Sequence, residues 1–345
     1  MAKKRIVFNG KFVTQQLTGV QRYANEIIAE FDKLIPKGVV ELAVPSNAVD
    51  LPNYENIKIV RTGAFKGNMW EQISFPLYLI KNKAVGVNLC NVAPLIKPDI
   101  VCIHDVNFLA NPHFYDKNFV RWYKLQFKNS CKNAKMILTV SNFSKNEIKK
   151  YSAKINCKIK VIPNAWQHFN RIIEDDSIFE KNKQLIKNNY YFSLMSVNKN
   201  KNLKWILNVA KINPNIIFAV AGGGNLKVFG EEIDLGTLSN VVYLGRVSDE
   251  EAKSLMKNCK AFLFPTYYEG FGIPPLEAMS TGAKAIVSNS SCMPEIYQNS
   301  VYYVNPDDYD VNLDKLLEKE VDNTQEVLNK YSWEKSARKL KELIF

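Results

Sequence analysis

Two glutamates, Glu269 and Glu277, stand with seven residues between them in a segment rich in glycine and proline. Glu269 falls in a predicted loop, and Glu277 falls in the first turns of the helix predicted next. The N-terminus of a helix that points at a cleft favours phosphate, because its free N–H groups and its dipole attract negative charge. Two carboxylates would repel that phosphate unless each binds something else, and hydroxyl groups are suitable donors. A sugar on one side of a diphosphate and a ribose on the other would satisfy both glutamates.

The residues around this pair predict the elements that hold it. A buried strand is expected at Ala261–Phe264. Gly270 and Gly272 follow in the loop, where glycine lets the backbone approach a ligand closely. A helix then begins at Pro274, since proline suits the first turn, and Gly282 suits its C-terminal cap. The segment therefore predicts a strand, a ligand-binding loop and a helix in succession.

The stretch Glu-Gly-Phe-Gly-Ile-Pro-Pro-Leu-Glu-Ala-Met, which begins at Glu269, resembles the donor motif of glycosyltransferase family 4. In that family, two glutamates with this spacing bind a nucleotide-diphosphate sugar. The spacing alone occurs often by chance, and the specificity comes from the residues between the glutamates. The alternative is a structural loop whose glutamates form surface ion pairs.

The resemblance covers nearly the whole chain and implies the GT-B architecture, in which two Rossmann-like doubly wound domains face each other across a cleft. The matching segments are Leu17–Tyr23, Ile103–Leu109, Ser141–Lys145, Val161–Asn164, Gly222–Asn225, Val241–Glu251, Pro294–Glu295, Tyr303–Asp307 and Tyr331–Glu334. The donor-binding residues that it implies are Gly19, Lys199, Lys201, Gly245, Arg246, Val247, Glu269, Gly270, Phe271, Gly272, Ile273, Leu276 and Glu277.

The resemblance also gives catalytic roles to His104, Glu269 and Lys201. His104 follows a predicted strand and would contact the transferred sugar together with Glu269; its alternative is a hydrogen-bonded structural histidine. Lys201 would neutralise the donor diphosphate. The family's preceding arginine is absent, and Lys199 could replace it only as a point charge; the alternative for both is a solvated loop lysine. Gly19 would place N–H groups near the diphosphate, and its alternative is a plain turn glycine.

Short apolar stretches alternate with helical patterns along the chain, which predicts two parallel α/β domains. We expect an N-terminal acceptor-side domain at residues 1–165, a donor-binding domain at 166–330, and a last helix within 331–345 that packs back on the first domain. The expected strands are Arg5–Phe8, Glu41–Val44, Ile57–Val60, Gly86–Leu89, Ile100–Ile103, Met136–Val140 and Lys160–Ile162, then Tyr191–Val197, Ile216–Ala221, Val241–Leu244, Ala261–Phe264 and Lys284–Ser288.

The composition fits a globular protein of 345 residues, with 46% hydrophobic and 23% charged residues. Its apolar runs are far shorter than the roughly 18 residues of a membrane-spanning helix, and no secretory signal is recognisable. Six cysteines without a CxxC pair suit a reducing cytosol. We therefore expect a protein that is cytoplasmic or peripheral on the inner face of the plasma membrane. Only three histidines and no suitably placed DxD motif predict that neither a metal nor another cofactor is needed.

The formal net charge of +12 requires an explanation. Six basic residues are spaced by three or four positions between 117 and 135, which places them on one face of a predicted helix. One interpretation is a solvated helix face, another is an anionic membrane surface that holds a lipid-linked acceptor, and nucleic-acid binding has no motif to support it. The six residues are Lys117, Arg121, Lys124, Lys128, Lys132 and Lys135.

These observations predict a retaining hexosyltransferase, with retention implied by the resemblance alone. It would move a hexose from a nucleotide-diphosphate sugar, with GDP-mannose as the first candidate, to a saccharide or polyprenyl-diphosphate-linked acceptor in surface polysaccharide biosynthesis. One alternative is a sugar-nucleotide epimerase or hydrolase of the same fold. Another is a non-enzymatic protein that binds anionic surfaces, although the paired glutamates would repel a polyanion. The sugar, base, linkage and oligomeric state do not follow from the sequence.

Overall fold

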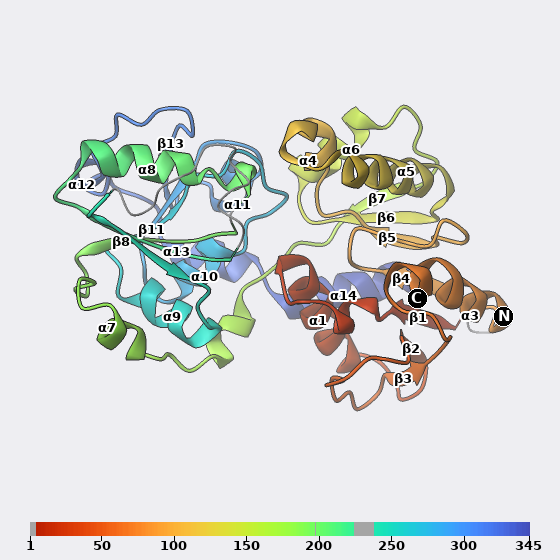
Figure 1. The fold of residues 1–345 in the computed structure, drawn as a ribbon. Helices are drawn as coiled ribbons and strands as arrows, with labels where there is room; N and C mark the ends of the chain where they lie inside the picture. The colour runs from red at the N-terminus through yellow and green to blue at the C-terminus, as the bar shows by residue number, and fades with distance from the viewer. Residues whose placement is uncertain (1–4, 197, 224–237) are drawn as a thin grey trace. The chain divides into compact units, whose positions relative to one another are not determined.

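The computed structural model describes residues 5–196, 198–223 and 238–345, and the chain divides into two compact units. One unit contains the chain up to Asn164 together with Trp333–Phe345, and the other contains Ala165–Ser332 (Figure 1). Each unit is a parallel sheet with helices packed against it. The prediction of two doubly wound α/β domains is confirmed.

The sheet of the first unit has seven parallel strands among the described residues, in the order β3-β2-β1-β4-β5-β6-β7. Its strands are β1 Ile6–Asn9, β2 Val40–Val44, β3 Lys58–Arg61, β4 Val85–Asn88, β5 Ile100–Cys102, β6 Met136–Thr139 and β7 Lys158–Val161. Its helices are η1 Lys11–Thr14, α1 Gly19–Asp32, α2 Gly67–Met69, the π-helical η2 Trp70–Ser74, α3 Phe75–Lys81, α4 Asn107–Ala110, η3 Pro112–Phe114, α5 Lys117–Asn133, α6 Asn142–Tyr151 and α14 Trp333–Ile344.

Alternating side chains of β1 show which helices cover which face of this sheet. Val7 belongs to the core cluster of Trp70, Phe75 and Leu79, so η2 and α3 cover its face. Phe8 points the other way, where its ring lies 5.4 Å from the ring of Phe31 on α1. Helices α1 and α3 therefore cover opposite faces.

Helix α5 covers the same face as α3. Gly86 pairs in register with Val7, and a Cβ at Gly86 would lie 2.6 Å from Leu79, so this strand residue must be small where α3 packs. Asn88, two residues along β4, pairs with Val101 of β5, so Val101 points to the same side. Val101 in turn shares a core cluster with Phe127 of α5.

The last helix, α14, belongs to the first unit and packs along α1. The rings of Trp333 and Tyr23 meet edge to face at 6.1 Å. The Ser336 hydroxyl donates to the carbonyl of Pro163 at 2.8 Å, and Lys341 Nζ donates to the carbonyl of Leu34 at 2.7 Å. The chain thus returns to its first unit after completing the second.

The second unit has six parallel strands among the described residues, in the order β10-β9-β8-β11-β12-β13, and Trp205 is fully buried in its core. Its strands are β8 Tyr190–Leu194, β9 Ile217–Ala221, β10 Val241–Gly245, β11 Ala261–Phe264, β12 Ala285–Ser288 and β13 Tyr302–Val304. Its helices are η4 Gln167–Arg171, α7 Ser177–Lys181, η5 Lys199–Lys201, α8 Leu203–Ile212, α9 Asp249–Lys257, α10 Pro274–Ser280, α11 Met293–Tyr297, α12 Leu313–Leu316 and α13 Thr324–Lys330.

Two details differ from the expectations. Strand β13 had not been predicted, and its register with β12 adds it to the edge of the sheet. Lys135 lies beyond the end of α5, because the helix stops at Asn133; its ammonium group pairs with Asp99 at 2.7 Å. The predicted end of one strand, Val197, lies outside the described residues, and β8 ends at Leu194.

Candidate active site

Two loops that follow β8 and β11 bring Lys201 and Glu269 together. Lys201 Nζ forms an ion pair with Oε1 of Glu269, and the side chains are only 22% and 15% exposed. The ammonium group also lies 5.5 Å from the ring centroid of Phe264, the last residue of β11. Partial shielding strengthens the interaction of these charges with a ligand, because less water screens them. The pair combines a cation for phosphate with a carboxylate for hydroxyl groups.

Asparagines lock the Lys201 loop onto its neighbours. Asn202 is buried and adopts the left-handed conformation, with φ 58°. Its Nδ2 donates to the carbonyls of Pro265 at 3.0 Å and Pro306 at 2.9 Å. The N–H of Tyr267 donates to the carbonyl of Asn200 at 2.8 Å. Asn202 therefore positions the lysine that precedes it, a role that the sequence had not indicated.

The loop between β11 and α10 is fixed at Gly272. This glycine has φ +78°, and a Cβ there would lie 2.7 Å from the Cε atom of Met293. Its carbonyl accepts a hydrogen bond from the Tyr297 hydroxyl. The buried ring of Phe271 meets Tyr331 edge to face at 5.1 Å. The positive φ at position 272 favours glycine, and the hydrogen bond from Tyr297 fixes this part of the loop that carries Glu269.

Glu277 lies in the first turn of α10 and is buried against His168 of η4. The Glu277 Oε1 atom lies 2.8 Å from His168 Nε2, and the two residues are 7% and 2% exposed. A hydrogen bond donated by the imidazole N–H fixes the rotamer of the carboxylate and satisfies a buried oxygen. His168 is a candidate positioning residue that the sequence analysis missed, because 109 positions separate it from its partner.

The turn after β9 contacts the end of β10. The N–H of Gly222 donates to the carbonyl of Gly245 at 2.6 Å. A Cβ at Gly223 would lie 2.3 Å from Nε of Arg246, so the arginine packs across this turn. The rest of the turn predicted at Gly222–Asn225 lies outside the described residues.

In the first unit, His104 is buried at the carboxyl end of β5. Its Nε2 lies 2.8 Å from the carbonyl oxygen of Leu89, and its ring meets the edge of Tyr23 at 4.8 Å. Burial lowers the pKa of His104 to about 4, so the ring is neutral near pH 7. Since a carbonyl only accepts, Nε2 carries the proton and Nδ1 keeps its lone pair. His104 can therefore accept a hydrogen bond, and it is not poised as a general acid.

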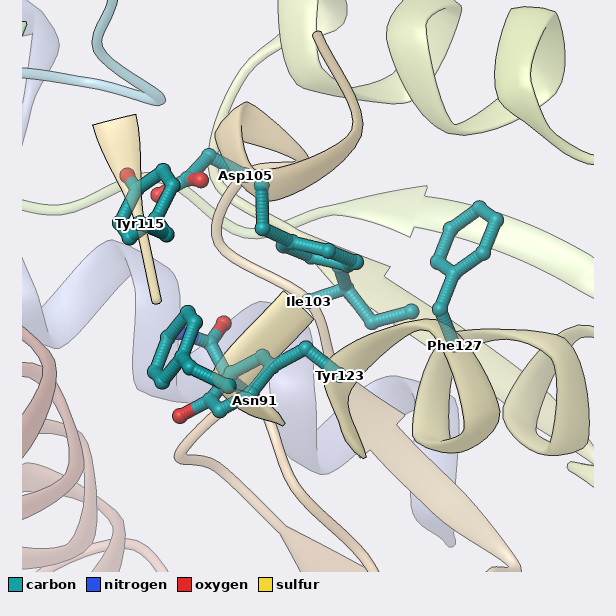
Figure 2. A pocket seen from close by; sticks show the side chains of 8 residues that line it. Asn91, Ile103, Asp105, Tyr115, Tyr123 and Phe127 are labelled. Atoms are coloured by element: carbon teal, nitrogen blue, oxygen red, sulfur yellow. The ribbon is translucent and has the colours of Figure 1, made fainter. Parts of the chain in front are cut away.

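Two adjoining cavities open in the first unit beside this histidine. The smaller, of about 140 Å³, has mostly aromatic walls, with Asp105 and Tyr115 toward one end and Phe127 toward the other (Figure 2). Phe119 of α5 stacks between Tyr115, which precedes the helix, and Tyr123 of the same helix, with ring centroids 5.2 Å and 4.1 Å away. This cavity offers flat apolar surfaces and a carboxylate.

The larger cavity, of about 420 Å³, shares Asn91, Phe119 and Tyr123 with the smaller one. Its polar wall is a buried network at the carboxyl ends of β1 and β4. Lys11 Nζ lies 2.6 Å from Glu71 and donates to Asn68 at 2.8 Å. Together the cavities combine hydrogen-bonding groups with aromatic walls, the chemistry that suits a molecule with several hydroxyl groups.

Comparison with known proteins places the chain in a family. Residues 174–335 match the profile described as glycosyl transferases group 1. The chain is 30% identical over 260 residues to the O-antigen chain mannosyltransferase RfbU of Salmonella typhimurium, an alignment that covers 72% of this chain and 69% of the relative. It is 27% identical over 228 residues to the O-antigen chain mannosyltransferase B of Escherichia coli, which covers 61% of this chain and 58% of that protein. The chain belongs to the group 1 glycosyl transferases.

Solved structures agree with this assignment at the level of the fold. Sucrose-phosphate synthase from Thermosynechococcus elongatus has a TM-score of 0.75 and 14% identity, and covers 99% of this chain and 98% of its own. HepE from Anabaena, in complex with UDP and glucose, has a TM-score of 0.70 at 14% identity, with 99% of each chain covered. The predicted GT-B fold is therefore confirmed. As a group 1 glycosyl transferase the chain is an enzyme, and its mannosyl- and galactosyltransferase relatives support a hexosyltransferase.

The structure sorts the predicted donor residues of this glycosyl transferase into two groups. Lys201, Glu269, Gly270 and Glu277 lie in or beside the loops that meet after β8 and β11. Three others have buried side chains that pack beneath the loop between β11 and α10. They could contact a ligand mainly through their backbone atoms: Phe271, Ile273 and Leu276.

The remaining predicted residues lie on other segments. Lys199 begins η5 two positions before Lys201, so with about three residues per turn the two ammonium groups leave the helix on different sides. Gly245 ends β10 with φ +64°, and Arg246 and Val247 follow it. Gly19 is the first residue of α1, after the N-cap Thr18.

Among the described residues, no group of three or more histidine, cysteine, aspartate or glutamate side chains could hold a metal ion. Within the same residues, no helix combines the length and apolar character needed to cross a bilayer.

Proposed function

We propose that this enzyme transfers a mannosyl group, with retention of configuration, from GDP-mannose to a saccharide or a polyprenyl-diphosphate-linked saccharide. The observation that best supports this proposal is the shielded Lys201–Glu269 ion pair. Its two residues lie on loops that a backbone hydrogen bond joins. Mannose is favoured because relatives over most of the chain are mannosyltransferases by name. The product would be part of a cell-surface polysaccharide, made on the cytoplasmic side of the membrane.

Each donor-site residue has a separate task in this proposal. Lys201 neutralises the diphosphate as negative charge develops on the leaving group. Glu269, held beside Lys201, accepts hydrogen bonds from hydroxyl groups of the mannosyl ring. Glu277, oriented by His168, accepts from the ribose hydroxyl groups. His104 accepts a hydrogen bond from a sugar hydroxyl through Nδ1, which its neutral state allows.

The chemical step needs no protein nucleophile. The acceptor oxygen attacks the anomeric carbon on the face that the diphosphate leaves. The bond between that carbon and the phosphate oxygen breaks, and the departing phosphate takes the proton of the acceptor hydroxyl. No metal or other cofactor is part of this proposal, since Lys201 supplies the positive charge.

The acceptor saccharide is assigned to the two cavities of the first unit. Aromatic rings offer flat surfaces to the apolar faces of sugar rings, and the polar wall offers donors and acceptors to their hydroxyl groups. Asp105 lines the smaller cavity and Asn68 the larger one. An Asp105→Asn change should therefore raise KM for the acceptor and leave KM for the donor unchanged.

The direct test is turnover of a panel of nucleotide sugars with and without saccharide acceptors. GDP-mannose should give an acceptor-dependent product whose new linkage has the anomeric configuration of the donor by NMR. Turnover that persists after treatment with EDTA is expected. Release of free mannose regardless of acceptor would favour a hydrolase, and an inverted linkage would exclude the retaining mechanism.

A further inference from the structure

We infer that the outward face of helices α2, η2, α3 and α5 docks on an anionic lipid bilayer, with an apolar stripe that enters the interface and a basic face that binds the headgroups. The inference extends the proposed function but does not depend on it, because lipid binding can be measured without donor or acceptor.

The apolar stripe runs along the continuous helical segment 67–81 and the residue before its N-cap. Its side chains recur every three or four residues, the spacing that aligns them on one face of a helix. Each is more than a third exposed: Phe65 41%, Met69 55%, Ile73 38%, Leu77 61% and Ile80 53%. Single exposed apolar residues are ordinary, but a contiguous row marks an interaction site.

The opposite side of the same segment anchors it to the fold. Trp70, Phe75 and Leu79 are fully buried in a core cluster with Val7 of β1. The helix is thus apolar on two sides, and the core accounts for only one of them. A helix that is apolar beyond its core face requires a second apolar environment.

Charge around the stripe indicates which environment that is. The only acidic side chain between residues 61 and 83 is Glu71, which is buried and paired with Lys11. The exposed basic residues at the ends of the stripe are Lys66, Lys81 and Lys83. An apolar face bordered by cations fits the boundary between acyl chains and anionic headgroups.

Helix α5 contributes a second, larger set of cations on the same side of the molecule. It contains no acidic residue from Lys117 to Asn133, and its outward basic residues are exposed: Lys117, Arg121, Lys124, Lys128 and Lys132. Since α3 and α5 cover the same face of the sheet, the surfaces that they turn away from that sheet lie on one side of the unit.

A short loop joins the two helices physically. Gln72, within the stripe segment, accepts from the N–H of Leu95 at 2.9 Å and donates to the carbonyl of Ala93 at 3.1 Å. From the other side, Asn129 of α5 donates to the carbonyl of Leu95 at 3.1 Å. The next residue, Ile96, is 65% exposed. Apolar stripe, loop and basic helix therefore form one continuous surface.

Co-sedimentation of the full chain with vesicles tests this surface. The protein should bind vesicles of equal parts phosphatidylcholine and phosphatidylglycerol, bind pure phosphatidylcholine weakly, and lose affinity as salt rises. Replacing Lys124, Lys128 and Lys132 with glutamine should weaken binding to the anionic vesicles roughly a hundredfold, at about one factor of five per lysine. Matched glutamine replacements at exposed lysines of the second unit, Lys183, Lys211 and Lys319, should change little.

The apolar stripe is tested separately with Leu77→Glu and Ile80→Glu. Both positions are more than half exposed, so these variants should fold, and their binding should fall by about tenfold or more. The control is Ile186→Glu with Ile212→Glu, at 64% and 54% exposure in the second unit, which should bind as the original chain does.

Turnover of a water-soluble saccharide acceptor should be unchanged in the Leu77→Glu and Ile80→Glu variants, which separates loss of docking from loss of the transferase itself. Unaltered vesicle binding in both sets of variants would overturn the inference and leave a solvated basic helix. A change in oligomeric state without lipid, in place of a change in vesicle binding, would also overturn it, because the stripe would then join two copies of the chain.

Discussion

The candidate donor site of the second unit and the candidate acceptor cavities of the first unit are formed by different kinds of structural element. The donor site consists of short loops after neighbouring strands, tied by backbone hydrogen bonds and by Asn202, with charge concentrated in the Lys201–Glu269 pair. The acceptor cavities have walls of side chains from helices, including the aromatic stack on α5. If the proposed assignments hold, a donor common to many such enzymes is bound by a compact local motif. The acceptor is then recognised by the shape of a cavity that several helices form.

The largest expected effect concerns Lys201, because we propose that its charge neutralises the leaving group. Lys201→Ala should lower kcat/KM by about a hundredfold to a thousandfold, the loss typical of removing one group that stabilises a developing anion. Steady-state kinetics with the donor measures this. Lys199→Ala is the matched control, since that lysine leaves η5 on another side, and its effect should stay within a few fold. Equal losses in the two variants would contradict the assignment.

The two glutamates should differ in kind as well as in size. Glu269→Gln should lower kcat by about ten- to a hundredfold and spare the affinity for free nucleoside diphosphate, because Glu269 is assigned to the reacting sugar. Glu277→Gln should instead raise KM for the donor and weaken nucleoside diphosphate binding in calorimetry, since ribose contacts are alike in ground and transition states. The opposite pattern would reverse the two roles.

His168 offers a smaller and more selective change. Removing its ring by His168→Ala should let the Glu277 carboxylate turn away, and KM for the donor should rise by about tenfold or less, with kcat nearly preserved. His168→Gln can still donate to the carboxylate and should recover most of the affinity. If alanine and glutamine behaved alike, or if kcat fell with KM unchanged, His168 would be a core residue without a role in positioning.

The smallest expected effect is the response of His104 to pH. Its folded pKa of about 4 lies below the ordinary value of 6.5, so the unfolded chain binds the proton more tightly. The stability from this residue is therefore complete above about pH 6.5 and is lost as the pH falls toward 4. Turnover should show no ionisation of His104 between about pH 6 and 8. Thermal unfolding measured between about pH 6.5 and 4, with His104→Gln as the control, checks the stability change, and the prediction is contradicted if both proteins lose stability alike.

The contrast between the units also explains what could be predicted from sequence. The strands other than β13 followed from apolar runs, and the donor loop followed from Glu269, Gly272 and Glu277, because local patterns determine both. The His168–Glu277 contact could not be predicted, since its partners meet only after the second unit has folded. The spacing of its basic residues predicted α5, and only the structure shows that Phe119 and Tyr123 of the same helix line a cavity. Lys135 shows the same limit, because a periodic pattern does not reveal that Asp99 is its partner.

The return of the chain to its first unit has a consequence for biosynthesis. During translation, residues up to Asn164 emerge from the ribosome long before α14, because the whole of Ala165–Ser332 is synthesised in between. Until then the face of α1 that packs against Trp333 is uncovered, and the nascent unit exposes apolar surface such as the ring of Tyr23. Domains tend to fold in the order of their synthesis, but here the earlier domain must wait for the later one. A nonsense mutation within α14 should therefore damage the domain that was translated first, while the most recently translated sheet keeps all its strands.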